Sequence, residues 1–366
     1  RKKMIKQKLI FIISIMSIFF IYGCNSQNNN QYEGKIILEE QGSFAFGGIV
    51  SKAAGEFNRY DLFPSSNGQT YHSDHGYAFY QIPIDARKYP IVFLHGGGQS
   101  AKSFETTPDG REGFQNIFLR KGFSVYLVDQ PRRGRAGRSF VSATINPIPD
   151  EQYLFNFFRI GFYPDYFDGV QFKRDEETFN QYYRQVTPNI GNFDEEVISD
   201  AMSELFNKIG EGILVAHSQG GGPAFFTAIK NDKVKSLILY EPGGCTFPFP
   251  AGEIPSANDI TMPAYLPIKE ISLDDFNKLA KIPIVLYFGD FIPKEHSENP
   301  FLEEWRLRIE LMKVWEETLK KHGGDVEIVM LPEVGIHGNT HFPFSDLNNL
   351  EVADLLYKYL EDKKLN

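Results

Sequence analysis

The chain has 366 residues, of which 42% are hydrophobic and 23% charged, and this balance excludes a disordered, collagen-like or coiled-coil protein. The formal net charge is −9, and no long segment is rich in Lys or Arg, which argues against a nucleic-acid partner. Two cysteines are too few for a disulfide framework or a Cys-based zinc site.

The N-terminal residues predict an export signal. Five cations and no acidic residue accompany LIFIISIMSIFFIY, a 14-residue apolar run over residues 9–22. A helix needs about 20 apolar residues to span a bilayer, whereas a basic start and a short apolar core are typical of a secretory signal. The run is followed by Cys24 and an Asn/Gln-rich tract, as in a bacterial lipoprotein signal. We therefore expect a signal over residues 1–23, a lipidated Cys24 that anchors an exported protein to a membrane, and a polar tether over residues 24–32. The alternatives are a plain signal peptide with secretion, and an uncleaved anchor.

Beyond this segment the hydrophobic pattern predicts one α/β domain over residues 33–366. Short β-rich runs come first, at 35–40, 44–50 and 77–83. They are followed by wholly apolar runs that alternate with helix-compatible stretches, at 90–94, 124–128, 212–216, 236–240, 283–288 and 326–331. Strands that are apolar on both faces belong to parallel sheets covered by helices, so the pattern favours a mostly parallel, doubly wound sheet. The last helix is expected over residues 350–362, where apolar residues recur at helical spacing.

A long segment, residues 140–193, interrupts the alternation and is rich in aromatic residues. Thirteen Phe and Tyr side chains fall between residues 151 and 193. We expect this insertion to form a cap over the site, with more than half of the rings in the core of the cap itself. A cap of this composition suits an ester substrate with an apolar or aromatic moiety.

The most informative stretch is GILVAHSQGGGPAFFTAIK, residues 212–230, which predicts a nucleophile elbow. A buried strand runs into a sharp turn at Ser218 and then into a helix, and the residues two positions before and after this serine, Ala216 and Gly220, are small. At this turn the hydroxyl of Ser218 would lie beside the first amides of the helix, where negative charge is favoured.

The elbow predicts where the other site residues belong in the chain. A strand followed by HGGG at residues 95–98 provides a second amide for an oxyanion, and Gly97 and Gln219 are the candidate donors. The base should follow the last strand, where both His337 and His341 occur, and spacing does not separate them. The acid is either Asp290, which follows the penultimate strand, or Glu241, one strand earlier.

Several strings together resemble a small group of secreted bacterial esterases within the α/β-hydrolase superfamily. They include LHGGGQS, FRIGFYPDYFDGVQF, AHSQGG, YEPGGC and GIHGNTHFPFSDLNNLEVADLL, and the resemblance extends from about residue 90 to 362. It implies that Glu241 is the acid and His341 the base, with Asp290 and His337 as the runners-up. It also implies Gly97 and Gln219 as oxyanion donors. Where the group can carry an adjacent cysteine pair, this chain has Gly97 and Gly98.

These features predict a serine esterase that acts through an acyl-enzyme and requires no metal or organic cofactor. A thioesterase, amidase or lactonase could use the same triad. A non-catalytic, surface-tethered binding protein with a hydrolase fold is the alternative outside enzymes.

Overall fold

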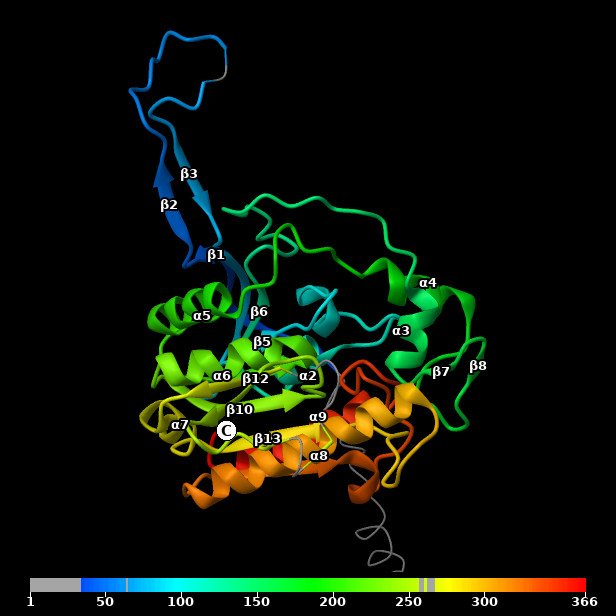
Figure 1. Cartoon of the computed structure of the whole chain (residues 1–366). Coiled ribbons are helices and arrows are strands. Elements are labelled where there is room, and N and C mark those ends of the chain that lie inside the picture. Colours follow the sequence, from blue (N-terminus) through cyan, green and yellow to red (C-terminus); the bar gives the residue numbers. More distant parts are fainter. Residues whose placement is uncertain (1–33, 64, 257–259, 262–266) are drawn as a thin grey trace, which may run out of the picture. The chain divides into compact units, whose positions relative to one another are not determined.

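The centre of the structure is an eight-stranded sheet, shown in the computed structural model of Figure 1. The structure describes residues 34–63, 65–256, 260–261 and 267–366, so the expected signal, the tether and Cys24 lie outside the described residues. Residues Ile36–Asn366 form one compact unit.

The order of the strands across the sheet is β1-β4-β6-β5-β9-β10-β13-β14. Only β4 is antiparallel to its neighbours, and the remaining pairs run parallel. This arrangement confirms the predicted mostly parallel α/β sheet. The strands are β1 (Leu38–Phe46), β4 (Gly76–Pro83), β5 (Ile91–Leu94), β6 (Val125–Asp129), β9 (Gly212–His217), β10 (Val234–Tyr240), β13 (Ile284–Phe288) and β14 (Val326–Met330).

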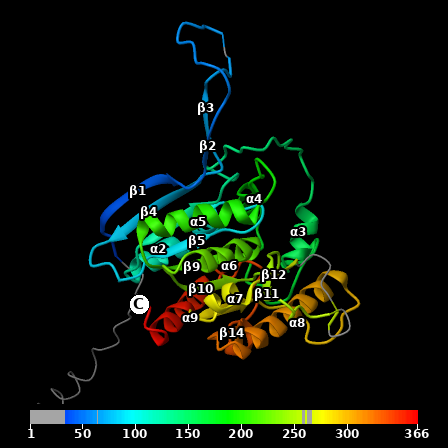
Figure 2. The same cartoon turned by 60° about the vertical axis from the view of Figure 1, so that its left-hand side comes forward.

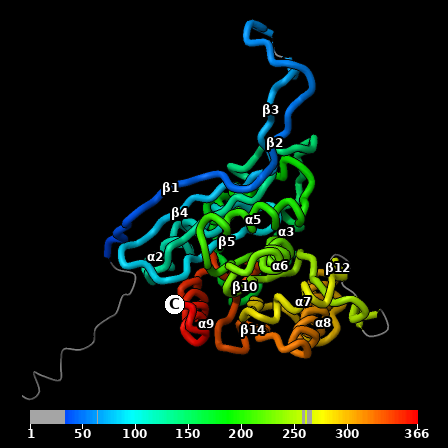
Figure 3. Tube along the Cα trace, turned by 90° about the vertical axis from the view of Figure 1, so that its left-hand side faces the viewer, coloured from blue at the N-terminus to red at the C-terminus, as the bar shows by residue number. Residues whose placement is uncertain are grey.

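Helices cover both faces of the sheet because the central strands are apolar on both sides. On one face Phe93 of β5 packs against Phe114 and Phe118 of α2. On the other, alternate strand residues such as Leu94 and Leu239 join a core with residues of α5 to α8. In Figure 3, α2 and α9 lie to one side of β5, β10 and β14, and α6, α7 and α8 to the other. These helices are α2 (Phe114–Arg120), α5 (Glu195–Ile209), α6 (Gly221–Lys230), α7 (Leu273–Leu279), α8 (Pro300–Lys321) and α9 (Asn349–Asp362).

The first strands differ from the sequence prediction. The two runs expected at 35–40 and 44–50 form one strand, β1, which ends where Gly47 and Gly48 adopt φ values of 61° and 83°. Such values favour glycine and turn the chain out of the sheet. It then forms a separate hairpin of β2 (Ile49–Lys52) and β3 (Thr70–Ser73), which extends away from the sheet in Figure 2.

The aromatic-rich segment folds into short elements whose rings pack on one another. Phe155, for example, contacts Tyr163, Tyr166 and Phe179, and Tyr182 contacts Tyr183. The elements are α3 (Glu151–Phe157), β7 (Gly161–Phe162), β8 (Asp165–Tyr166) and α4 (Glu176–Arg184). Elsewhere β11 (Phe247–Pro250) pairs with β12 (Ile268–Ile271), and 3-10 turns occur at η1 (Ala101–Phe104), η2 (Ser218–Gly220) and η3 (Leu331–Val334).

No helix within the described ranges is long and apolar enough to cross a membrane.

Candidate active site

Ser218 lies on the sharp turn between β9 and α6. Its φ of 51° is in the left-handed region, which is costly for a residue with a side chain and is found at functional turns. Gly220 must be small, because a Cβ there would lie 2.6 Å from the carbonyl oxygen of His95. The turn therefore has the strained geometry of a nucleophile elbow, and it presents Ser218 half-buried at the carboxyl edge of the sheet.

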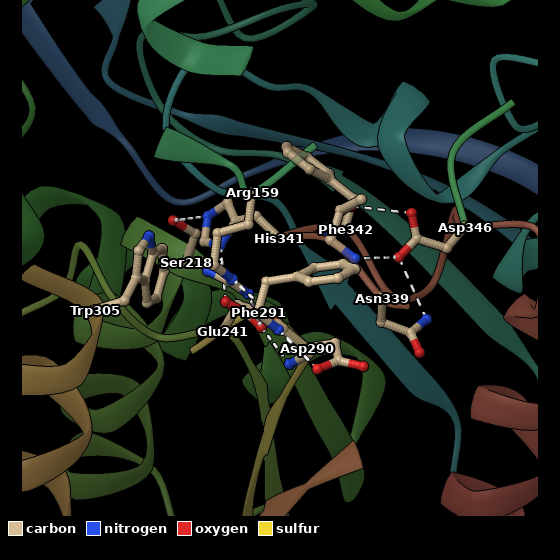
Figure 4. A network of polar contacts seen from close by, with 12 residues as sticks. Arg159, Ser218, Glu241, Asp290, Phe291, Trp305, Asn339, His341, Phe342 and Asp346 are labelled. Atoms are coloured by element: carbon tan, nitrogen blue, oxygen red, sulfur yellow. Dashed lines mark hydrogen bonds and ion pairs between the residues drawn. The ribbon is translucent and has the colours of Figure 1, made fainter. Parts of the chain in front are cut away.

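The structure brings Ser218, His341 and Glu241 together in one chain of hydrogen bonds (Figure 4). His341 Nε2 lies 2.9 Å from Ser218 Oγ, and its Nδ1 lies 3.0 Å from Glu241 Oε2. Glu241 directly follows β10, and His341 lies in the loop between β14 and α9. A hydroxyl, an imidazole and a carboxylate in this order can deprotonate the hydroxyl as it attacks a carbonyl.

The electrostatic surroundings favour a neutral imidazole beside an ionised carboxylate. Burial lowers the pKa of His341 below its usual value and outweighs the opposite effect of Glu241, while the charge of Arg159 lowers it further. Burial raises the pKa of Glu241, but Arg159 and His341 more than compensate and hold that pKa below its usual value. His341 is thus in the form that accepts a proton at neutral pH.

The two runners-up lie in different surroundings. The side chain of His337 is 67% exposed and its Nδ1 is 3.7 Å from Asp290 Oδ2. Asp290 Oδ2 accepts a hydrogen bond from the Gly338 amide at 2.9 Å, and the Asp290 amide donates to the carbonyl of Asn339 at 2.8 Å. Asp290 therefore braces the loop that carries His341, and it is the Glu241 carboxylate that contacts the imidazole.

The glycine-rich loop after β5 passes next to the elbow. A Cβ on Gly96 would be 2.9 Å from Ser218 Cβ, and one on Gly97 would be 3.2 Å from Gln219 Oε1. Gln219 is in the first turn after the strand, where amides have no partner within the helix. The candidate amides of Gly97 and Gln219 thus belong to adjacent segments beside the hydroxyl. Arg133, buried next to this loop, donates to the carbonyls of Gly96 at 3.3 Å and Gln99 at 3.4 Å.

Three site residues were not foreseen from the sequence. Arg159 is fully buried and donates through Nη2 to Glu241 Oε1 at 2.7 Å. His217 donates through Nε2 to the carbonyl of His341 at 2.9 Å. Asp346 accepts from the amide and the hydroxyl of Thr340 at 2.7 and 2.9 Å, next to the imidazole-bearing residue. Nothing in the local sequence marks these residues, because their partners are brought close only by the fold.

A metal site is a separate question. Among the residues described, no group of three or more His, Cys, Asp or Glu side chains is arranged to hold a metal ion.

The chain belongs to the alpha/beta hydrolase family, whose model matches residues 91–318. It is 30% identical over 306 residues to the probable secreted lipase phiG of a fungal species (strain ATCC 74256), covering 75% of this chain and 82% of the relative. It is also similar to the solved structure of a novel bacterial esterase, with 30% identity and a TM-score of 0.70. That match covers 90% of this chain and 98% of the other. The fold and the hydrolase family expected from the sequence are therefore confirmed.

Proposed function

We propose that the protein is a serine esterase that cleaves carboxylic esters through an acyl-enzyme. The observation that carries the proposal is the chain of hydrogen bonds from Ser218 Oγ through His341 to Glu241, with distances of 2.9 and 3.0 Å, on a strained strand-to-helix turn. The names of the two relatives, a probable secreted lipase and a bacterial esterase, support ester hydrolysis as the reaction.

In the proposed acylation step, His341 Nε2 takes the proton of Ser218 as Oγ attacks the ester carbonyl carbon. The carbonyl π electrons move to oxygen, and the Gly97 and Gln219 amides stabilise the resulting oxyanion. Glu241 holds the Nδ1 proton and stabilises the imidazolium. The intermediate collapses when the bond to the alkoxy oxygen breaks, and the imidazolium donates its proton to the leaving alcohol.

Deacylation repeats these steps with water as the nucleophile. His341 takes a proton from water, the hydroxide oxygen bonds to the acyl carbon, and the bond to Ser218 Oγ breaks. The proton returns to the serine, and a carboxylic acid leaves. Because every proton and electron pair is accounted for by the triad, the cycle needs no cofactor.

The proposed substrate carries an apolar or aromatic group. The ring of Phe158 stacks on the imidazole of His341 with centroids 4.9 Å apart, and the ring of Trp305 lies 5.0 Å from it. Such apolar surroundings favour apolar groups and strengthen the electrostatic contacts at the reacting carbonyl.

We also infer that the protein is exported. The basic and apolar start of the chain supports an export signal, and the fungal relative is named as secreted. Lipid attachment at Cys24 is part of this proposal.

The proposal is tested with a panel of p-nitrophenyl esters that differ in acyl length and aromatic character. We expect the turnover of Ser218→Ala to be lower than that of the wild type by a factor on the order of 10³ or more. A fluorophosphonate should label the wild type but not this variant. Ser199→Ala, which removes a buried hydroxyl on α5, is the matched control and should keep full turnover. Retention of a tenth of the activity by Ser218→Ala contradicts the serine mechanism.

A further inference from the structure

Arg159 connects the aromatic-rich insertion to the candidate triad. Its guanidinium donates through Nη2 to Glu241 Oε1 at 2.7 Å and through Nε to the carbonyl of Asp290 at 2.9 Å. The guanidinium also lies over the ring of Trp305, 4.3 Å from the centroid. Both partners of the ion pair have fully buried side chains, so water does not screen their interaction.

The two residues before Arg159 contact His341, the base, and Trp305, whose ring lies beside it. The carbonyl of Phe158 accepts the backbone amide of His341 at 3.0 Å, and its ring stacks on the imidazole at an interplanar angle of 10°. The carbonyl of Phe157 accepts Nε1 of Trp305 at 2.8 Å. Residues 157–159 therefore contact the acid, the base and the ring beside the base, and Figure 4 shows Arg159, His341 and Trp305 gathered there.

The two oxygens of Glu241 have different partners. Oε1 accepts from Arg159 and from the amide of Gly289, whereas Oε2 faces His341. A carboxylate held on one oxygen by a cation and an amide cannot rotate without breaking both hydrogen bonds. Within the described residues, Arg159 provides the only Lys or Arg salt bridge to Glu241.

We propose that Arg159 is a positioning residue, which holds Glu241 Oε1 so that Oε2 orients His341, and that the insertion is thereby part of the reaction centre as well as its cover. The inference rests on the proposed function, since it assigns Arg159 a role in that reaction. A purely structural role would instead affect folding and leave the titration of the triad unchanged.

Loss of the Arg159 charge should shift the pH dependence of kcat/KM in one direction. The active form has a neutral His341 and an ionised Glu241. A proton added to either group adds positive charge close to the Arg159 cation, and this repulsion lowers the pKa of that group. Substitution of Arg159 by an uncharged residue removes the repulsion, so the pKa rises whichever of the two groups takes the proton. The acid limb of kcat/KM therefore moves to higher pH.

Other titratable groups near His341 and Glu241 remain in place in a variant that lacks the Arg159 charge. Arg308 on α8 is paired with Glu304 at 2.9 Å and also lowers the pKa of His341. Burial raises the pKa of Asp346 to about 7, and this residue reaches Thr340 instead of the imidazole. Burial lowers the pKa of His217 well below its usual value, so its ring is neutral.

The experiment compares Arg159→Met and Arg159→Lys with the wild type, with p-nitrophenyl esters as substrates from pH 4 to 9 and with folding checked by circular dichroism. Arg159→Met should lower kcat at least about tenfold, less than the about 10⁴-fold loss for a triad acid, and move the acid limb up by about one pH unit. Arg159→Lys should leave the limb in place, because the charge remains. It should still lower kcat, because an ammonium lacks the fork that reaches both acceptors.

Arg132→Met is the matched control. Arg132 forms a buried pair with Asp74 at 2.8 Å, so this variant also loses a buried ion pair, but it should keep both the kcat and the acid limb. If Arg159→Met does not fold, Arg159→Lys keeps the inference falsifiable, because an unchanged kcat in that folded variant would overturn it. The inference is overturned if the folded Arg159 variants match the wild type in kcat and in the acid limb. A wild type that neither turns over esters nor reacts with a fluorophosphonate overturns the proposed function instead.

Discussion

Glu241→Gln removes the charge of the acid in the candidate triad and keeps the shape of its side chain. The carboxylate accepts hydrogen bonds from His341 Nδ1, Arg159 Nη2 and the Gly289 amide, and it is fully buried. An amide of the same shape has no charge and has N–H donors on one side. The charge of Arg159 loses its anion in either orientation, and the N–H side faces either Arg159 or His341. In the second arrangement the imidazole changes tautomer, so its Nε2 carries a hydrogen and cannot accept the serine proton.

The substitution should lower both the turnover and the stability of the protein. Loss of the orienting acid should lower turnover about 10⁴-fold with the nucleophile still present. A buried Arg159 without its anion should cost roughly 3–5 kcal/mol in the free energy of unfolding. Turnover must therefore be measured on folded protein, with p-nitrophenyl ester kinetics normalised to the fraction that circular dichroism shows to be folded.

Asp290→Asn is the contrasting substitution. Asp290 accepts from the amides of Gly338 and Phe291, and an Asn oxygen can keep one of these hydrogen bonds. We expect a loss of roughly 1 kcal/mol in stability and turnover within about tenfold of the wild type. The opposite ranking of the two variants, with Asp290→Asn the more severe, would refute the assignment of Glu241. Equal severe losses would refute the view that Asp290 only braces the loop.

Further predictions concern the pH dependence of activity and stability, the room beside Ser218 Oγ, and lipid attachment at Cys24. The kcat/KM of the wild type should fall as the pH drops through a pKa of His341 that lies below the usual 6.5, because only the neutral imidazole accepts the serine proton. Asp346 binds its proton more tightly when folded, with a pKa of about 7 against 3.8, so wild-type stability should decline relative to Asp346→Asn as the pH rises through this window, as measured by urea unfolding. Gly244→Ala should fold normally but lower kcat/KM, because its methyl would be 3.7 Å from Ser218 Oγ; unchanged kinetics would contradict this. The full chain expressed in a bacterium should partition into detergent, and Cys24→Ser should partition into water; equal partitioning of both would contradict lipidation.

Much of the fold was predictable because its signals are local. Each central strand is a short apolar run between polar stretches, so β5, β6, β9, β10, β13 and β14 were expected within a few residues of their bounds. The turn at Ser218 was likewise marked by small residues next to it in the sequence. The early strands were less well predicted, since the run at 44–50 crosses Gly47 and Gly48, whose positive φ values end β1.

The geometry of the candidate site depends on contacts between distant residues, and spacing could not provide it. Both Glu241 and Asp290 end strands, and only the sheet and the loop after β14 decide which carboxylate faces an imidazole. The contact between Arg159 and Glu241 joins residues 82 positions apart. An arginine within an aromatic segment suggests a solvated side chain. Its burial follows from the ion pair and the ring of Trp305, which form only when the insertion packs on the sheet.

The most direct test of the account is a crystal structure of the protein after reaction with a p-nitrophenyl phosphonate, an analogue of the first tetrahedral intermediate. The account predicts that phosphorus is bonded to Ser218 Oγ and that the phosphonyl oxygen lies about 2.7–3.1 Å from the amides of Gly97 and Gln219. His341 should remain within hydrogen-bond distance of Glu241. Phosphorus on another residue, or a phosphonyl oxygen remote from both amides, would contradict the proposed mechanism.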